Sequence, residues 1–154
     1  MSIILILVIW GSTIKGEPIA NDLMAWYARQ GISVTVENIQ YRVIPSDSCK
    51  EPYWWATIPE RSHNYVYLID MPCLFYGKYV GVATISGNLG MVRLGQGFSY
   101  VLVHEVAHMM GAHDRYLSYD IMSIWADRAY AQDSISPTTW QELGGQIVWL
   151  PYIR

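Results

Sequence analysis

One stretch of eleven residues contains three of the chain's four histidines together with two acidic side chains: HEVAHMMGAHD, residues 104–114. An α-helix has 3.6 residues per turn, so side chains four residues apart lie on one face. We therefore predict that His104 and His108 bind one metal ion from the same face of a helix, with Glu105 beside it. Two imidazoles and an adjacent carboxylate are typical of a zinc site in which the carboxylate acts as a base.

A catalytic zinc ion takes three protein ligands and leaves one position for water. Gly111 can adopt backbone angles that end the helix and turn the chain back toward the two imidazoles. The register then favours Asp114 as the third ligand, and His113 remains its rival. Glu142, on a later predicted helix, is a further alternative, but it would leave Gly111 and Asp114 without a role.

The chemistry predicted for such a site is hydrolysis. Glu105 is expected to take a proton from the water at the zinc ion and to pass it to the leaving group, while the metal polarises the attacked carbonyl. A pair of buried histidines satisfied by their neighbours is the simplest alternative, and the register of Gly111 and Asp114 argues against it. A catalytically inactive, zinc-stabilised peptide-binding domain is a second alternative, and a purely structural site would not need Glu105.

The elements that position this stretch can be predicted from the periodicity of apolar residues. Residues 3–10 form a buried strand, and a helix with Pro18 in its first turn follows and ends at Gly31. Residues 32–36 alternate as a second strand, which residues 39–43 prolong past a bulge. This order predicts a right-handed βαβ unit with parallel strands.

Further strands are expected over residues 64–70 and 79–86, with a short edge strand over 91–94. A helix over 98–110 is apolar almost all round, which indicates that it is buried. The chain after Gly111 is predicted to be irregular until a last helix, which Ser136 caps, Pro137 begins and Gly144 ends. Residues 45–62, with three prolines and the run Tyr-Trp-Trp at 53–55, are predicted to form an aromatic-rich loop.

Composition restricts the remaining possibilities. The 154 residues fit one domain, and a net charge of −3 with scattered basic residues excludes a nucleic-acid partner. The apolar run at 3–10 is too short to span a bilayer and lacks the features of a secretory signal, so no membrane partner is expected. Cytoplasmic localisation is the default, with an exported form left open. Cys49 and Cys73 lack the spacing of a zinc-thiolate site, and free thiols or one disulfide both remain open.

The string His-Glu-x-x-His-x-x-Gly-x-x-Asp at residues 104–114, followed eight residues later by Met122, resembles the metzincin metallopeptidases. It is similar in particular to their aspartate-ligand branch, such as snapalysin. Residues 114–116 (Asp-Arg-Tyr) and 120–123 (Asp-Ile-Met-Ser) are also similar to the immune inhibitor A peptidases. The specific match covers about residues 104–123.

The resemblance implies an α+β (α/β-like) fold with a twisted mixed sheet, a backing helix, an active-site helix and a small C-terminal subdomain. A single catalytic domain, residues 1–154, would divide into an upper subdomain at about 1–111 and a lower one at about 112–154. The resemblance also implies a zinc-dependent endopeptidase with one zinc ion and a protein or peptide substrate. Met122 would belong to a Met-turn, a hydrophobic floor beneath the zinc, and a final helix would follow.

The sequence departs from the commoner metzincin pattern at two positions. Asp114 stands where most members have histidine, and Ile124 stands where some have a metal-binding tyrosine. No inhibitory pro-segment is visible ahead of the first strand, and a protein inhibitor or self-association is left open as the control of activity. We expect the substrate to add as an antiparallel strand at the sheet edge near residues 91–94.

Overall fold

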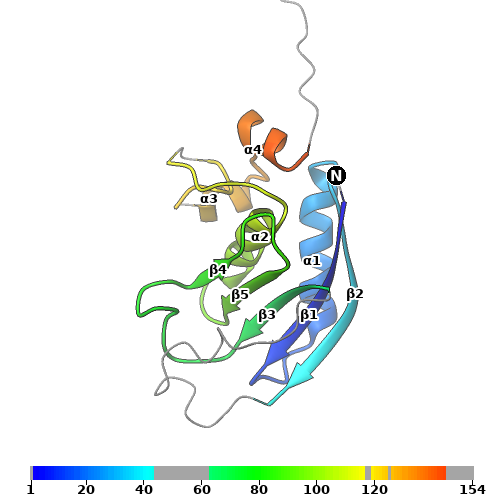
Figure 1. Cartoon of the computed structure of the whole chain (residues 1–154), viewed down its shortest axis with the longest axis vertical. Helices are drawn as coiled ribbons and strands as arrows, with labels where there is room; N and C mark the ends of the chain where they lie inside the picture. Colours follow the sequence, from blue (N-terminus) through cyan, green and yellow to red (C-terminus); the bar gives the residue numbers. More distant parts are fainter. Residues whose placement is uncertain (1, 44–62, 117–118, 125, 145–154) are drawn as a thin grey trace, which may run out of the picture.

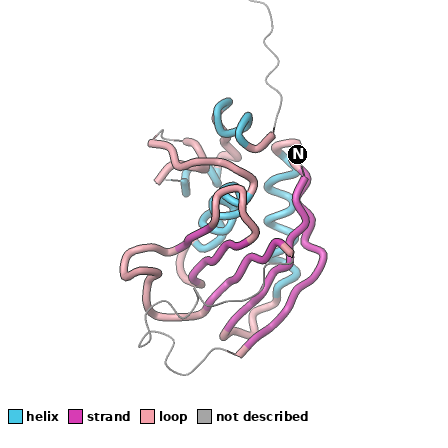
Figure 2. Tube along the Cα trace, viewed as in Figure 1, coloured by secondary structure: helices cyan, strands magenta, loops and turns pink. Residues whose placement is uncertain are grey.

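The structure is a computed structural model that describes residues 2–43, 63–116, 119–124 and 126–144. Its centre is a five-stranded sheet in the order β2-β1-β3-β5-β4. The two long helices, α1 and α2, pack on one face of this sheet (Figures 1 and 2). Alternate residues of β1 point to opposite faces, so that Leu5 and Leu7 contact the helices while Ile6 and Val8 join a second apolar cluster.

The predicted βαβ unit is present at the start of the chain. It comprises β1 (Ser2–Trp10), α1 (Gly16–Arg29) and β2 (Ser33–Arg42), and the two strands are parallel. Their register shifts between Leu5 and Ile6 of β1, which confirms the predicted bulge in the second strand. Gly31 ends the helical segment with φ of +74°.

The far side of the sheet differs from the prediction in two respects. β3 (Asn64–Ile69) and β5 (Leu89–Arg93) are parallel neighbours, and β4 (Gly81–Ala83) pairs antiparallel with β5. The strand predicted over residues 79–86 is therefore shortened to three residues. The edge predicted near residues 91–94 is wrong, because the hairpin that joins β4 to β5 places β4 outside β5.

Helix α2 (Phe98–Met109) carries the predicted metal-binding residues and is buried over most of its surface. It packs on β4 and β5 and contacts α1 on one side. The apolar character that the sequence shows all round this helix is thus accounted for by neighbours on several sides.

Two short helices, α3 (Ala126–Ala131) and α4 (Pro137–Glu142), follow the metal-binding stretch. The sequence analysis missed α3, whose six residues have too few turns for a periodic pattern. Trp26 of α1 holds α3 in place, since its ring stacks on Tyr130 and its indole N–H donates to the Tyr130 carbonyl at 3.1 Å. The predicted cap of α4 is present: the Ser136 hydroxyl accepts a hydrogen bond from the Thr139 N–H.

Cys73 is disulfide-bonded, which decides between the two states that the sequence left open for it. Cys49 and the predicted aromatic-rich loop over residues 45–62 lie outside the described residues. Among the helices that the structure describes, none combines the length and hydrophobicity that crossing a bilayer requires.

Candidate metal centre

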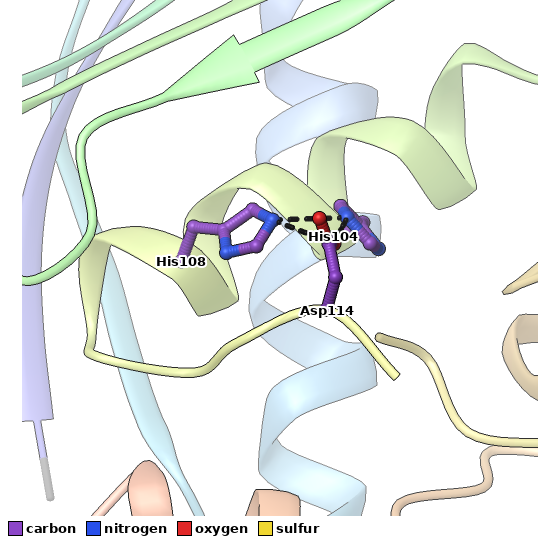
Figure 3. A group of neighbouring side chains, drawn as sticks. All are labelled: His104, His108 and Asp114. Carbon is purple, nitrogen blue, oxygen red and sulfur yellow. Dashed lines mark hydrogen bonds and ion pairs between the residues drawn. The ribbon is translucent and has the colours of Figure 1, made fainter. Parts of the chain in front are cut away.

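Helix α2 presents His104 and His108 on one face, one turn apart, as the spacing predicts (Figure 3). The two rings meet edge to face with their centroids 4.7 Å apart. Their Nε2 atoms lie 3.1 Å from each other. Both imidazoles therefore direct the same nitrogen to one point beside the helix.

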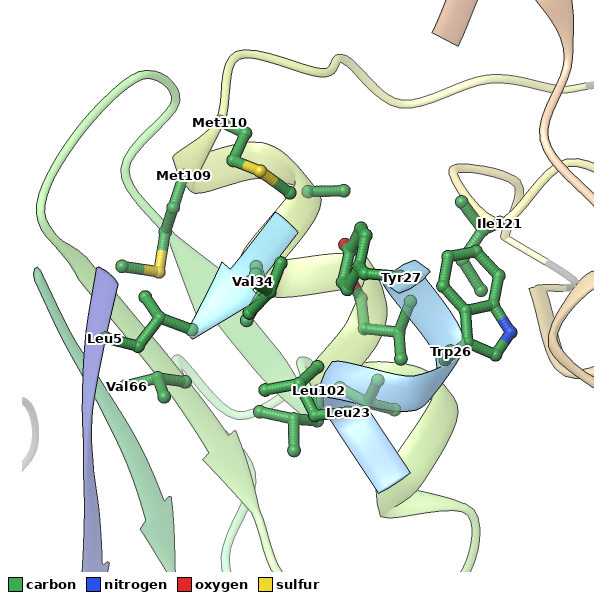
Figure 4. Packing of buried hydrophobic residues seen from close by; sticks show 14 of the residues in the cluster. Leu5, Leu23, Trp26, Tyr27, Val34, Val66, Leu102, Met109, Met110 and Ile121 are labelled. Carbon is green, nitrogen blue, oxygen red and sulfur yellow. The ribbon is translucent and has the colours of Figure 1, made fainter. Parts of the chain in front are cut away.

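The other side of α2 is fixed by the apolar core (Figure 4). Leu102 packs there with Leu23 and Trp26 of α1. The Tyr27 hydroxyl, which is fully buried, donates a hydrogen bond of 2.6 Å to the carbonyl of Val103, the residue before His104. Burial raises the pKa of Tyr27 well above its ordinary value, so the hydroxyl remains protonated and able to donate.

Backbone carbonyls determine the tautomer of each imidazole. The Nδ1 of His104 lies 2.8 Å from the Ile121 carbonyl, and the Nδ1 of His108 lies 2.7 Å from the Ala112 carbonyl. Because a carbonyl oxygen only accepts, each Nδ1 must carry the hydrogen. In the neutral imidazoles both Nε2 atoms then present lone pairs toward one another, as in histidines that bind a metal.

The chain after α2 turns at Gly111 and brings Asp114 back to the imidazoles. Gly111 has φ of +110°, and a Cβ there would lie 3.1 Å from Ser86 Oγ and 3.3 Å from the Glu142 carbonyl oxygen. A larger residue would therefore be strained at this turn. The Oδ1 of Asp114 lies 3.0 Å from His104 Nε2 and 3.1 Å from His108 Nε2 (Figure 3).

These three side chains fit a zinc ion. They form the group of possible metal ligands that the described residues contain, with ligand atoms within 4.8 Å of one another. In a tetrahedral site with bonds of about 2.0–2.1 Å, neighbouring ligand atoms lie about 3.3 Å apart, which is close to the observed separations. When both imidazoles are neutral, two lone pairs and a carboxylate oxygen lie at this distance, and a shared cation would offset their repulsion.

The pKa values show how tightly these groups are coupled. The hydrogen bond with His104 lowers the pKa of Asp114, which keeps it ionised. Burial lowers the pKa of His108, and the charge of His104 lowers it further. For His104 burial acts in the same direction, but the hydrogen bond with Asp114 and the charge of Glu105 outweigh it, so that its pKa is raised.

Glu105 projects beside the two histidines and is only 5% exposed. Burial raises its pKa to about 7. The neighbouring edge strand β4 approaches it closely at Gly81, where a Cβ would lie 2.7 Å from Glu105 Oε1 and 2.7 Å from Val101 Cγ1. Sequence analysis missed Gly81 because the contact depends on how β4 pairs in the sheet.

Glu105 and the three clustered side chains line a cleft of about 590 Å³. The residues that complete its walls are Lys78, Tyr79, Val80, Gly81, Val82, Ala83, Ile85, Tyr100, Val101, Ser123 and Ile124. Lys78 is the only charged side chain among them. The cleft thus extends along β4 and is mainly apolar outside the metal-binding group.

Met122 is fully buried, and the segment around it lies against the metal-binding group. The carbonyl of its neighbour Ile121 accepts from His104, and its own N–H donates to the Asp120 carboxylate at 2.9 Å. The second Asp120 oxygen accepts from the Thr139 hydroxyl of α4 at 2.8 Å. Ile124 is exposed at the cleft, at the position where some metzincins have tyrosine.

The structure does not place His113, the predicted rival ligand, with the other two histidines. Its Nδ1 instead donates to the Glu142 carboxylate at 2.7 Å. Glu142 lies in α4, where it binds His113 and Arg115 rather than joining the metal-binding group. Burial raises the pKa of Glu142, but the hydrogen bonds from His113 outweigh it, and the net shift is downward.

Solved structures of zinc peptidases have the same fold. Archaemetzincin from Methanopyrus kandleri superposes with a TM-score of 0.67 at 14% identity, over 93% of this chain and 94% of that one. A zinc-dependent peptidase from Methanocorpusculum labreanum (strain Z) gives a TM-score of 0.52 at 12% identity, over 90% of this chain and 99% of that one. Metalloproteinase-II from Bacteroides fragilis gives 0.56 at 16%, over 92% of this chain and 52% of that one.

No protein-family model matches the sequence, and no curated protein matches it. The comparison with known proteins therefore rests on the similarity of structure alone. It shows that the chain has a zinc metallopeptidase fold, with a five-stranded mixed sheet and a small number of helices.

Proposed function

We propose that this chain is a zinc-dependent endopeptidase of the metzincin type, with one zinc ion held by His104, His108 and Asp114. The observation that carries the proposal is the convergence of the three ligand atoms beside the buried carboxylate of Glu105, in a cleft large enough for a peptide. When bound, zinc supplies Lewis-acid polarisation of the carbonyl and lowers the pKa of water. The likeness to archaemetzincin supports the class.

Asp114 is proposed as the third ligand rather than His113. Its Oδ1 is within 3.1 Å of both imidazole Nε2 atoms, whereas the His113 ring is held by Glu142. An aspartate in this role corresponds to the snapalysin-like and immune inhibitor A-like type that the motif resembles. Met122, buried beside the segment that contacts His104, is proposed as the Met-turn residue.

Glu105 is proposed as the general base and acid. Its carboxylate lies in the cleft beside the two histidines, and it is buried, which favours proton transfer at a pKa of about 7. In the proposed reaction Glu105 takes a proton from the attacking water and returns it to the leaving amine nitrogen. Apolar surroundings keep other water molecules from competing for this carboxylate.

The substrate is proposed to add to β4 rather than near residues 91–94. Among the described strands β4 pairs with β5 alone, so its outer edge can accept backbone hydrogen bonds from an extended peptide. Gly81–Ala83 also line the same cleft as Glu105. A peptide aligned on β4 would therefore pass the proposed metal centre.

The substitution Glu105→Ala tests this function. The variant is expected to lose cleavage of casein by at least a hundredfold, because it lacks the group that moves the proton. It should keep its affinity for zinc, because the three ligands remain. Glu37→Ala is the matched control, since Glu37 is exposed on β2 at the opposite edge of the sheet.

Casein cleavage by Glu105→Ala at the wild-type rate would contradict the role of Glu105. Equal zinc affinity in the wild type and in Glu105→Ala, without cleavage by either, would instead indicate a zinc-stabilised peptide-binding domain.

A further inference from the structure

Glu142 of α4 binds the residues on both sides of Asp114. One carboxylate oxygen, Oε2, accepts from the Nδ1 of His113 at 2.7 Å. The other, Oε1, accepts from the His113 backbone N–H at 3.3 Å and from the Arg115 guanidinium. The Glu142 side chain, on a separate helix, therefore holds both neighbours of the proposed third ligand: His113 through its ring and backbone, and Arg115 through its guanidinium.

Asp114 itself has few other restraints. Its side chain is 64% exposed, and its polar contacts in the described residues are those with the two imidazoles. On one side, the Ala112 carbonyl accepts from His108 and the Ala112 N–H donates to the Ala107 carbonyl at 3.0 Å; on the other, the Arg115 N–H donates to the Met122 carbonyl at 2.8 Å. The hydrogen bonds of Glu142 hold His113 and Arg115, the residues on either side of Asp114.

The Glu142 carboxylate also holds the ring of His113, the alternative third ligand. His113 is next to Asp114 in the chain, and its ring is a competent zinc ligand by type. Its Nδ1 is engaged by Glu142, which fixes the direction of the ring. The packing of α4 reinforces this arrangement, since the Glu142 carbonyl oxygen lies near Gly111 at the turn.

We propose that Glu142 is a positioning residue, which holds the segment 113–115 so that Asp114, and not His113, faces His104 and His108. This inference rests on the proposed zinc site. Outer partners of metal ligands fix ligand orientation, and their removal typically lowers metal affinity about 10–100-fold. The structure assigns that function to a helix that contributes no ligand of its own.

The test is zinc affinity of the purified chain, measured by competition with a chromogenic chelator. Glu142→Ala is expected to bind zinc at least tenfold more weakly than the wild type. Glu142→Gln keeps an acceptor oxygen for the His113 and Arg115 donors and should recover part of the affinity. Gln141→Ala, an exposed neighbour on the same helix, is the matched control and should bind as the wild type does.

Whether Asp114 or His113 binds the metal can be measured separately. Asp114→Ala should weaken zinc binding strongly in the wild type but less in the Glu142→Ala background, where the released His113 can replace it. The visible spectrum of the cobalt-substituted Glu142→Ala protein should then differ from that of the wild type, because a nitrogen replaces an oxygen ligand. Circular dichroism verifies folding, and if Glu142→Ala does not fold, Glu142→Gln decides the test.

Wild-type zinc affinity and an unchanged cobalt spectrum in a folded Glu142→Ala protein, or in Glu142→Gln where that variant decides, would overturn the proposal while leaving the zinc site intact. The variant His104→Ala distinguishes failure of the Glu142 proposal from failure of the proposed zinc site. If that variant binds zinc as tightly as the wild type does, the proposed site itself is wrong, and the role of Glu142 falls with it.

Discussion

The imidazoles of His104 and His108 are oriented by backbone carbonyls, not by other side chains. The Ile121 and Ala112 carbonyls accept from the two Nδ1 atoms, which leaves both Nε2 atoms directed at Asp114. Because a carbonyl cannot be removed by a single substitution, this orientation depends on the backbone path. The turn at Gly111 and the segment around Met122 thus orient the two imidazoles of the proposed metal centre.

At Gly81 the edge strand lies so close to the proposed base that an added Cβ would be 2.7 Å from Glu105 Oε1. We expect Gly81→Ala to lower kcat/KM for peptide cleavage about a hundredfold, because the added Cβ displaces the Glu105 carboxylate and small displacements of a catalytic group have effects of that size. Zinc affinity should be unchanged, since Gly81 contacts no proposed ligand. Peptide cleavage and chelator competition on the same protein provide the measurement.

Gly95→Ala is the control for this prediction, because a Cβ at Gly95 would meet no atom within 4 Å. Equal kcat/KM for Gly81→Ala and Gly95→Ala would show that the close approach of β4 is unimportant for Glu105.

The sequence predicted the candidate metal ligands that the structure brings together, but not the residues that contact their neighbours or the proposed base. The His104–His108 spacing is local and follows from the helical repeat, so it could be identified without a structure. Gly81 and Glu142 act through contacts between segments far apart in the chain. Their roles follow from strand pairing and from the packing of α4, which no short motif contains.

At the scale of elements, α4 is held by a buried carboxylate and not by its own length. Six residues are too few for an isolated helix to be stable. Asp120, which is 1% exposed, joins the Thr139 hydroxyl of α4 to the Met122 N–H. The final helix and the proposed Met-turn are therefore one hydrogen-bonded unit.

Removal of this carboxylate tests that unit. Asp120→Ala is expected to lower the free energy of unfolding by about 2–6 kcal/mol, because two buried donors lose their partner at roughly 1–3 kcal/mol each. The measurement is urea unfolding in the presence of a chelator, which separates stability from metal binding. Asp127→Ala, an exposed position on α3, is the control, and equal midpoints for the two variants would contradict the prediction.

The elements were predicted best where the apolar pattern is long. The strand β1 and the helix α2 follow from continuous apolar stretches and α1 from a helical repeat, and the capping signals at Ser136 and Pro137 identify α4. The short helix α3 has no such repeat, and Trp26 of α1 contributes to its position. The edge of the sheet was predicted wrongly, because strand order is decided by the β4–β5 hairpin and not by the composition of either strand.

At the scale of the whole molecule, the strand order places the proposed metal centre at one edge of the sheet. The order β2-β1-β3-β5-β4 leaves β4 outermost, and α2 packs directly against β4 and β5. The cleft that results is lined by β4, by α2 and by Asp114, Ser123 and Ile124. The division into upper and lower subdomains at about residue 111 stays a prediction.

The most direct test of the account is a zinc titration of the metal-depleted protein with peptide cleavage as the readout. We predict that activity is absent without metal, rises with added zinc and reaches a plateau at one zinc ion per chain. The His104→Ala protein should remain inactive throughout the same titration. Cleavage that is unchanged after complete removal of zinc, or a plateau that the His104→Ala protein also reaches, would contradict the central claim.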